Sequence, residues 1–200
     1  MSLESRGYAT RYESNDDRVL KYLFFSHRDA IARARRFHEV VLIDTTYKTN
    51  RQGILYVNIV GISNVGTRHS LNTFTIAGGL LVNEDEYAMS WIMSMLKDIV
   101  FNNGESPIFV TDAAMQLRNA IAINFHKSKH LLCAWHIANN FETRLRKTFQ
   151  EEDHWLELKS SLKAIINSRT LKDFEKAKET YLAVSKLSDD PKDVAGYLQR

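Results

Sequence analysis

The sequence predicts a mixed α/β fold that continues into an all-helical region. Three apolar segments in the first half are separated by short polar stretches, which is typical of an antiparallel meander. Two further apolar segments then alternate with amphipathic helical patterns, which is typical of parallel strands joined by helices. From residue 137 to residue 197, the hydrophobic spacing is helical almost throughout.

The first half of the chain is expected to hold one helix and the meander. Residues 1–17 are polar and expected to be loose or edge-like, and 18–25 could form a strand. Ser26 can cap a helix that follows, because its side chain can accept a hydrogen bond from the first helical turn. The predicted elements are a helix at 26–37, strands at 40–46, 54–62 and 69–82, a turn at 64–66, and a bulge or strand end at Gly78-Gly79.

The second half alternates helices and strands. Asn83 can cap a long helix whose first turn is acidic, as the helix dipole favours. The predicted elements are a helix at 83–101, a strand at 107–111, a helix at 113–125 and a strand at 130–134. Three antiparallel strands followed by parallel strands and helices is the chain order of the ribonuclease-H-like fold. We expect a lead-in segment at 1–38, a core of this fold at 39–140 and a helical region at 141–200.

Composition excludes several classes of protein. The chain has 200 residues, of which 44% are hydrophobic and 26% charged, values typical of a globular domain. Its net charge of +3 permits a nucleic-acid partner without demanding one. No apolar run is long enough for a transmembrane helix, so no membrane partner is expected. Cys133 is the single cysteine, which excludes an intrachain disulfide and favours a reducing compartment.

Two aspartates lie at the ends of predicted buried strands. Asp44 ends the apolar run from Val40, and Asp112 ends the run from Pro107. A charge there is costly unless it is paired. Two neighbouring carboxylates suit Mg²⁺ or Mn²⁺, which prefer oxygen ligands and support phosphodiester chemistry. The alternative is structural, because an aspartate after a strand is also a common helix cap.

The sequence motifs around these aspartates resemble those of Mutator-like element (MULE) transposases. The segment from Ile43 to Asn50, IDTTYKTN, resembles that family's first-aspartate motif, close to D-x-T-Y-x-T-N. The segment Val110-Thr111-Asp112 resembles its second-aspartate strand, and Cys133-Ala134-Trp135-His136 resembles its C-x-W-H motif. Glu84 and Trp91 match a glutamate and a tryptophan that precede the second aspartate in the family. The likeness covers roughly residues 18–200.

The resemblance implies a transposase core of ribonuclease-H-like fold. Such proteins cut transposon-end DNA and join it to target DNA in the nucleus, using Mg²⁺ or Mn²⁺ held by two aspartates and a glutamate. By position, Asp44 and Asp112 match the two aspartates as catalytic and metal-binding residues. The helical insertion of the family contributes to DNA contacts and assembly, so a homo-oligomer is also implied.

The sequence departs from the family pattern at several points. Ala113 stands where a basic residue usually follows the second aspartate, and Phe125-His126 replaces a usual Phe-Pro. The family's third acid lies beyond the helical insertion in a motif near E-S-x-N, and no such motif occurs in this sequence. No zinc-binding Cys/His cluster precedes residue 40. We therefore expect a transposase truncated before its third acid or, alternatively, a non-catalytic remnant that binds DNA or protein.

Two further groups of residues are candidates for the site. Cys133 and His136 have a metal-ligand spacing, but zinc needs about four ligands, so zinc is not expected and support of the active site is. Lys48, Asn50 and Arg51 follow the first aspartate and could hold DNA phosphates. The alternative for these three residues is a solvated turn.

Overall fold

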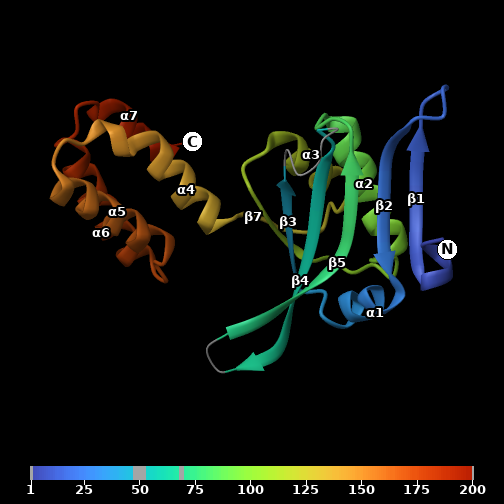
Figure 1. Cartoon of the computed structure of the whole chain (residues 1–200). Helices are drawn as coiled ribbons and strands as arrows, with labels where there is room; N and C mark the ends of the chain where they lie inside the picture. Colours follow the sequence, from blue (N-terminus) through green and yellow to red (C-terminus); the bar gives the residue numbers. More distant parts are fainter. Residues whose placement is uncertain (1, 47–52, 68–69, 200) are drawn as a thin grey trace. The chain divides into compact units, whose positions relative to one another are not determined.

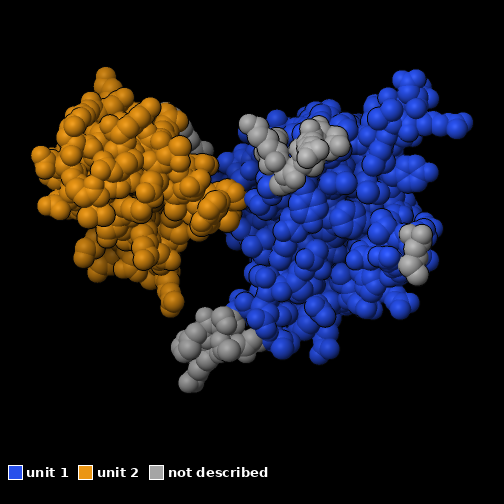
Figure 2. All heavy atoms as spheres, viewed as in Figure 1, with its two compact units in different colours: residues 1–132 blue, residues 133–200 orange. Residues whose placement is uncertain are grey.

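A computed structural model describes residues 2–46, 53–67 and 70–199 of the chain. The chain divides into two compact units, Met1–Leu132 and Cys133–Arg200 (Figures 1 and 2). Each unit has its own hydrophobic core.

The first unit is built on a seven-stranded sheet in the order β1-β2-β5-β4-β3-β6-β7 (Figure 1). Neighbouring strands from β1 to β3 pair antiparallel, whereas β3, β6 and β7 pair parallel. This confirms the predicted mixed sheet, with the meander β3-β4-β5 preceding the parallel strands. The strands are β1 (Tyr8–Ser14), β2 (Leu20–His27), β3 (Val40–Thr46), β4 (Leu55–Thr67), β5 (Ser70–Leu81), β6 (Ile108–Thr111) and β7 (His130–Leu132).

Three α-helices of this unit share one core with the buried face of the sheet. They are α1 (Arg28–Arg36), α2 (Glu86–Ile99) and α3 (Met115–Asn124), and a short 3₁₀ turn, η1 (Glu4–Arg6), precedes β1. The stripe of α2 that packs on the sheet includes Ile92, Met93 and Leu96, all fully buried. Because α2 and α3 connect strands in the β5-to-β6 and β6-to-β7 crossovers, their N-termini lie near the strand ends where the candidate site was predicted.

The helices begin one or two residues away from the predicted caps. His27, not Ser26, caps α1 by accepting a hydrogen bond from the backbone N–H of Asp29. The Ser26 hydroxyl is instead buried in β2, where it donates to the carbonyl of Ile76 at 2.6 Å. Asp85, not Asn83, caps α2, because its carboxylate accepts the N–H of Ala88 at 2.8 Å.

The glycine pair in β5 is not a bulge or a strand end, contrary to the prediction. Gly78 and Gly79 pair regularly with β2 on one side and β4 on the other. Neighbouring side chains leave no room for a Cβ at either position. A Cβ at Gly78 would lie 2.4 Å from Phe25 Cζ, and one at Gly79 would lie 2.4 Å from Ile92 Cδ1. The register of the β4–β5 ladder shifts instead at Ile59/Val60 and at Ser63/Thr67. The predicted turn at 64–66 lies inside β4.

The segment 1–38, expected as a lead-in, contributes β1, β2 and α1 to the first unit. Residues 8–14 form an edge strand, which is one of the two predicted alternatives, and β1 pairs with β2 along its whole length. The strand β2 in turn joins β5, so these strands widen the sheet on the side away from β3 and β6.

The second unit is all-helical, as predicted. Its core is rich in aromatic rings: Phe141 stacks on Trp155 with ring centroids 5.3 Å apart and also contacts Tyr181 and Tyr197. None of the helices in the described ranges is long and apolar enough to cross a membrane. The elements are α4 (Ala134–Leu145), η2 (Arg146–Thr148), α5 (Glu152–Ile166), α6 (Leu171–Ser185), α7 (Pro191–Gly196) and η3 (Tyr197–Gln199).

Candidate active site

The parallel register of β3 and β6 relates the two predicted aspartates. Val40, Val41 and Leu42 pair with Ile108, Phe109 and Val110. Asp44 lies two residues beyond Leu42 in β3, and Asp112 lies two residues beyond Val110, directly after β6. Because β3 and β6 run parallel, both aspartates lie at the same end of the sheet.

The alternation of burial places both side chains on the same face of the sheet. Val41 and Ile43 point into the core, so Leu42 and Asp44 point to the opposite face. Phe109 and Thr111 likewise point into the core, which directs Val110 and Asp112 to the opposite face. Asp44 is exposed and Asp112 is half-buried, so both carboxylates can be reached from solvent.

Asp112 also has a structural contact. Its Oδ1 accepts a hydrogen bond from the backbone N–H of Ala114 at 3.1 Å, just before α3 begins. Ala114 itself cannot cap α3, because its side chain has no acceptor. This hydrogen bond supports the alternative that Asp112 serves as a helix cap. The second oxygen of the carboxylate can still bind another partner.

Glu84 lies at the same end of the sheet, in the connection between β5 and α2. Burial raises the pKa of the Glu84 carboxyl, the charge of Asp112 raises it further, and a hydrogen bond with Thr45 opposes both effects. Thr45 directly follows Asp44 in β3. Glu84 is thus a further acid close to Asp112. Sequence reasoning did not nominate it for the site, although its match to the resembled family was the available signal.

His130 adds a nitrogen base beside the second aspartate strand. Its Nε2 lies 2.8 Å from the Thr111 hydroxyl, which is buried and also donates to the carbonyl of Asp112. Burial and then the charge of Arg118 lower the pKa of His130, while Asp112 opposes them. The neutral imidazole is therefore favoured at neutral pH. The hydrogen bond across β6 and β7 stabilises the strand end that carries Asp112.

The raised pKa of Glu84 gives a testable pH dependence. The folded chain disfavours the charged form of the Glu84 carboxyl. The resulting loss of folding stability is absent at pH values below the ordinary carboxyl range and appears as the pH rises through the raised pKa. Glu84→Gln should therefore raise the thermal midpoint at neutral pH, and the difference from wild type should vanish in acid. Thermal melts monitored by circular dichroism across pH check this.

Glu86→Gln is the matched control for Glu84→Gln. Glu86 is exposed in the first turn of α2, where the helix dipole favours a negative charge. Its neutralisation should lower the midpoint at neutral pH, the opposite sign. Equal shifts in both variants would contradict the electrostatic account of Glu84.

Cys133 and His136 open the second unit. Cys133 follows β7 directly and is the first residue before α4, while His136 lies in its first turn. The Trp135 ring between them is 66% exposed and contacts the His136 ring. Across residues 2–46, 53–67 and 70–199, no group of three or more His, Cys, Asp or Glu side chains is close enough to hold a metal ion. The predicted supporting role of the C-x-W-H motif therefore stays a prediction.

The predicted DNA-binding residues Lys48, Asn50 and Arg51 lie outside the described residues. They follow β3 directly in the chain, so their role also stays a prediction.

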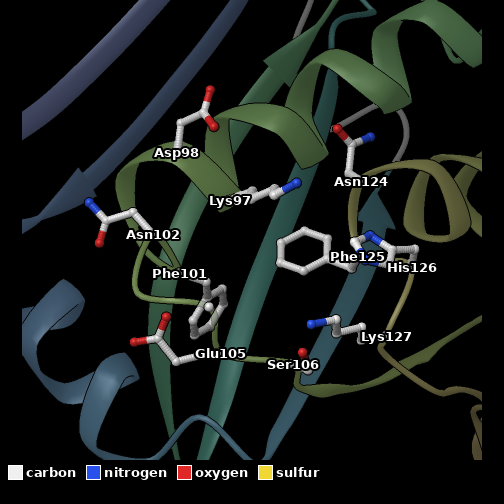
Figure 3. A pocket seen from close by; sticks show the side chains of 11 residues that line it. Lys97, Asp98, Phe101, Asn102, Glu105, Ser106, Asn124, Phe125, His126 and Lys127 are labelled. Atoms are coloured by element: carbon white, nitrogen blue, oxygen red, sulfur yellow. The ribbon is translucent and has the colours of Figure 1, made fainter.

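Figure 3 shows the side chains that line a cavity of about 350 Å³ in the first unit. Phe101 and Phe125 line it together with Lys97, Asn124 and Lys127. Ser106 at its edge comes just before β6, whereas Asp112 follows the other end of that strand. Neither Asp44 nor Asp112 lines this cavity, so we do not assign the chemistry of the aspartates to it.

Comparison with known proteins identifies relatives of the region that carries the aspartates. A family model described as MULE transposase domain matches residues 40–140, a range that includes Asp44, Glu84, Asp112, Cys133 and His136. Protein FAR1-RELATED SEQUENCE 4 of Arabidopsis thaliana is 23% identical over 177 residues, which cover 88% of this chain and 23% of the relative.

Two further relatives show the same pattern of partial coverage. Protein FAR1-RELATED SEQUENCE 5 of Arabidopsis thaliana is 22% identical over 178 residues, covering 88% of this chain and 21% of the relative. The PKS-NRPS hybrid synthetase cheA of Chaetomium globosum is 28% identical over 116 residues, covering 57% of this chain and 2% of that protein. The chain thus spans less than a quarter of the length of these relatives.

Proposed function

The chain belongs to the MULE transposase domain family, and we propose that the ends of β3 and β6 form a metal-dependent site for DNA cleavage and strand transfer. The observation that supports this proposal is the parallel pairing of β3 with β6, after which Asp44 and Asp112 lie at the same end of the sheet. DNA at transposon ends and at the target would be the substrate, and the nucleus would be the compartment.

The two aspartates are the residues that would hold Mg²⁺ or Mn²⁺. Carboxylate oxygens are the ligands these ions prefer, and two aligned carboxylates repel each other unless a cation joins them. The chemistry that such an ion supplies is activation of a water or 3′-hydroxyl and stabilisation of the leaving oxygen. The donor set of Asp44 and Asp112 therefore fits the proposed ion.

The residues around the aspartates would hold them in place. The main-chain ladder between β3 and β6 fixes the separation of the two strand ends. The N–H of Ala114 orients the Asp112 carboxylate through one oxygen. The hydrogen bond between Thr45 and Glu84 ties β3 to the start of α2, which keeps a further negative charge close to Asp112. This arrangement concentrates negative charge at one end of the sheet and so favours a divalent cation there.

A second candidate function is DNA binding without catalysis. It is favoured by the bond from Ala114 to Asp112, which gives that aspartate a structural reason to be present. It is also favoured because no metal-binding group of three acids, histidines or cysteines is assembled within the part of the chain that the structure describes. On this account, the domain would hold DNA phosphates through basic side chains while the strand ends stay inert.

Binding of Mn²⁺ and nicking of DNA test the catalytic proposal. Asp44→Asn and Asp112→Asn should each weaken Mn²⁺ binding about tenfold or more, as measured by isothermal titration calorimetry. On this proposal, the wild-type chain should nick supercoiled plasmid with Mn²⁺, and the same variants should lose that activity. The matched control is Asp98→Asn, which neutralises an exposed aspartate on α2 and should leave both Mn²⁺ binding and nicking unchanged.

The outcomes separate the two functions. Mn²⁺ binding and nicking that both depend on Asp44 and Asp112 would support the catalytic site. A salt-dependent gel shift with DNA that survives Asp44→Asn, without nicking by the wild type, would favour the binding function. A chain that binds neither Mn²⁺ nor DNA would contradict both.

A further inference from the structure

The strand β1 is the outermost strand of the sheet and has a neighbour only on its β2 side (Figure 1). It is seven residues long, whereas the strand at the opposite edge, β7, has three. Tyr12 in the middle of β1 is 71% exposed. A long, exposed edge strand is a template for pairing with another strand, and natural proteins commonly block or shorten such edges.

The hydrogen bonds at the two ends of β1 show which backbone groups point outward. The carbonyl of Gly7 accepts the N–H of Arg28, and the N–H of Asn15 donates to Val19, so both residues face the β2 side. Successive residues of a strand alternate in direction, and the register shift near Ser14 skips Lys21 on β2 rather than a residue of β1. Thr10, Tyr12 and Ser14 therefore present their N–H and C=O groups outward.

The charges on β1 lie on one face and have opposite signs. Arg11 is opposite Phe24 and Glu13 is opposite Tyr22, which places both charged side chains on the helix-covered face. Arg11 is exposed, and its Nη1 donates to the carbonyl of Thr10 at 2.8 Å. Glu13 accepts a hydrogen bond from the Tyr87 hydroxyl at 3.2 Å, and one of its two carboxylate oxygens makes that contact.

We propose that β1 pairs antiparallel with β1 of a second copy of this chain, around a two-fold axis at Tyr12. This register makes Tyr12 pair with itself and lets Thr10 exchange backbone hydrogen bonds with the partner's Ser14. It also sets Arg11 directly opposite the partner's Glu13 on the same face, and Glu13 opposite the partner's Arg11. The pairing is self-complementary in both backbone hydrogen bonds and charge, as a two-fold interface requires.

The neighbouring two-fold register is disfavoured by charge. An axis at Arg11 would place Arg11 opposite the partner's Arg11, and like charges directly opposite on a sheet are destabilising. In the proposed register, the guanidinium of Arg11 exchanges its local bond to the Thr10 carbonyl for the partner's Glu13 carboxylate. The freed carbonyl then accepts the backbone N–H of the partner's Ser14. Because the ladder spans only residues 10–14, we expect a dissociation constant in the micromolar range.

Charge exchange in the whole chain tests the register. Sedimentation velocity over a series of concentrations should show a monomer–dimer equilibrium for the wild type. Arg11→Glu and Glu13→Arg should each weaken the dimer about tenfold or more, because each creates two pairs of like charges per dimer. The double variant Arg11→Glu/Glu13→Arg restores two opposite-charge pairs and should return the dissociation constant to within about threefold of wild type.

Tyr12→Pro provides a test that does not depend on charge. The Tyr12 N–H points outward, so proline at this position removes the on-axis hydrogen bonds without taking one from the β1–β2 ladder. Circular dichroism melts verify that each variant is folded, and Tyr87→Phe controls for loss of the tyrosine contact to Glu13. The expected result is a monomer for Tyr12→Pro and a dimer for Tyr87→Phe.

Two results would overturn the proposal. One is a wild-type chain that stays monomeric up to hundreds of micromolar. The other is a dimer whose stability is unaffected by the charge variants and by Tyr12→Pro, since such a dimer would use another surface. Hydrogen exchange gives an independent readout: the amides of Thr10, Tyr12 and Ser14 should become protected as the concentration rises. Neither readout involves metal or DNA, so this test is independent of the proposed catalytic function.

Discussion

Phe141→Ala should unfold the second unit of the chain while leaving the sheet of the first unit intact. The Phe141 ring is 1% exposed and contacts three other aromatic rings, those of Trp155, Tyr181 and Tyr197. Truncating a buried phenylalanine to alanine costs about 3–5 kcal/mol. A single small core supplies a similar margin of stability, so this loss is comparable to the whole stability of the unit.

Hydrogen exchange measured by mass spectrometry checks the effect of Phe141→Ala region by region. Exchange should accelerate across 133–200 and stay unchanged across 1–132, because the two hydrophobic cores share no residue. Leu171→Ala, at a position 76% exposed on α6, is the matched control and should change stability by less than about 0.5 kcal/mol. Accelerated exchange in both units would show that they fold as one.

A graded variant at Tyr181 calibrates the result. The Tyr181 hydroxyl donates to the carbonyl of Val194 at 2.7 Å, and burial raises the pKa of this phenol, which keeps it a donor. Tyr181→Phe leaves that carbonyl buried without its donor and should cost about 1–3 kcal/mol. Its effect should fall between those of Leu171→Ala and Phe141→Ala.

Gly79→Val should destabilise the first unit by about 2–3 kcal/mol or more. A Cβ at this position would lie 2.4 Å from Ile92 Cδ1 and 3.5 Å from Val57 Cβ. Strands flank Gly79 on both sides, and Ile92 is fully buried, so neither the backbone nor the side chain of α2 has room to move. Urea denaturation monitored by circular dichroism measures the loss.

A double-mutant cycle identifies the cause of that loss. Ile92→Ala alone removes buried methyl groups and should also destabilise the unit, but it opens space beside Gly79. The combination should therefore cost clearly less than the sum of the two single variants. Gly196→Ala, where an added Cβ meets no atom within 4 Å, is the control and should be close to neutral. Strict additivity at 79 and 92 would rule out the clash as the cause.

Much of the fold could be predicted from local pattern. The apolar runs before Asp44 and Asp112 are β3 and β6, and their order in the chain led to the correct mixed sheet. The placement of the two aspartates at one end of the sheet follows from strand pairing, because β3 and β6 run parallel. These features depend on hydrophobic periodicity, which a single sequence records well.

Other features depend on contacts that the sequence does not record locally. Glu84 lies close to Asp112 and Thr45 because of the path of the connection between β5 and α2, in which it lies. The choice between Ser26 and His27, or between Asn83 and Asp85, as helix caps depends on which side chain another strand or loop has already engaged. The sequence left β1 open between a loose segment and an edge strand, because its polar edge position weakens the alternation that marks a strand.

The strands that carry Asp44 and Asp112 to the same end of the sheet are joined by a main-chain ladder. Backbone hydrogen bonds are available to every residue type except proline, so the apolar positions of β3 and β6 can exchange among similar residues without moving the carboxylates. Such a scaffold tolerates extensive divergence. That tolerance is consistent with relatives that retain only 22–28% identity to this chain, because strand pairing can be kept while the side chains change.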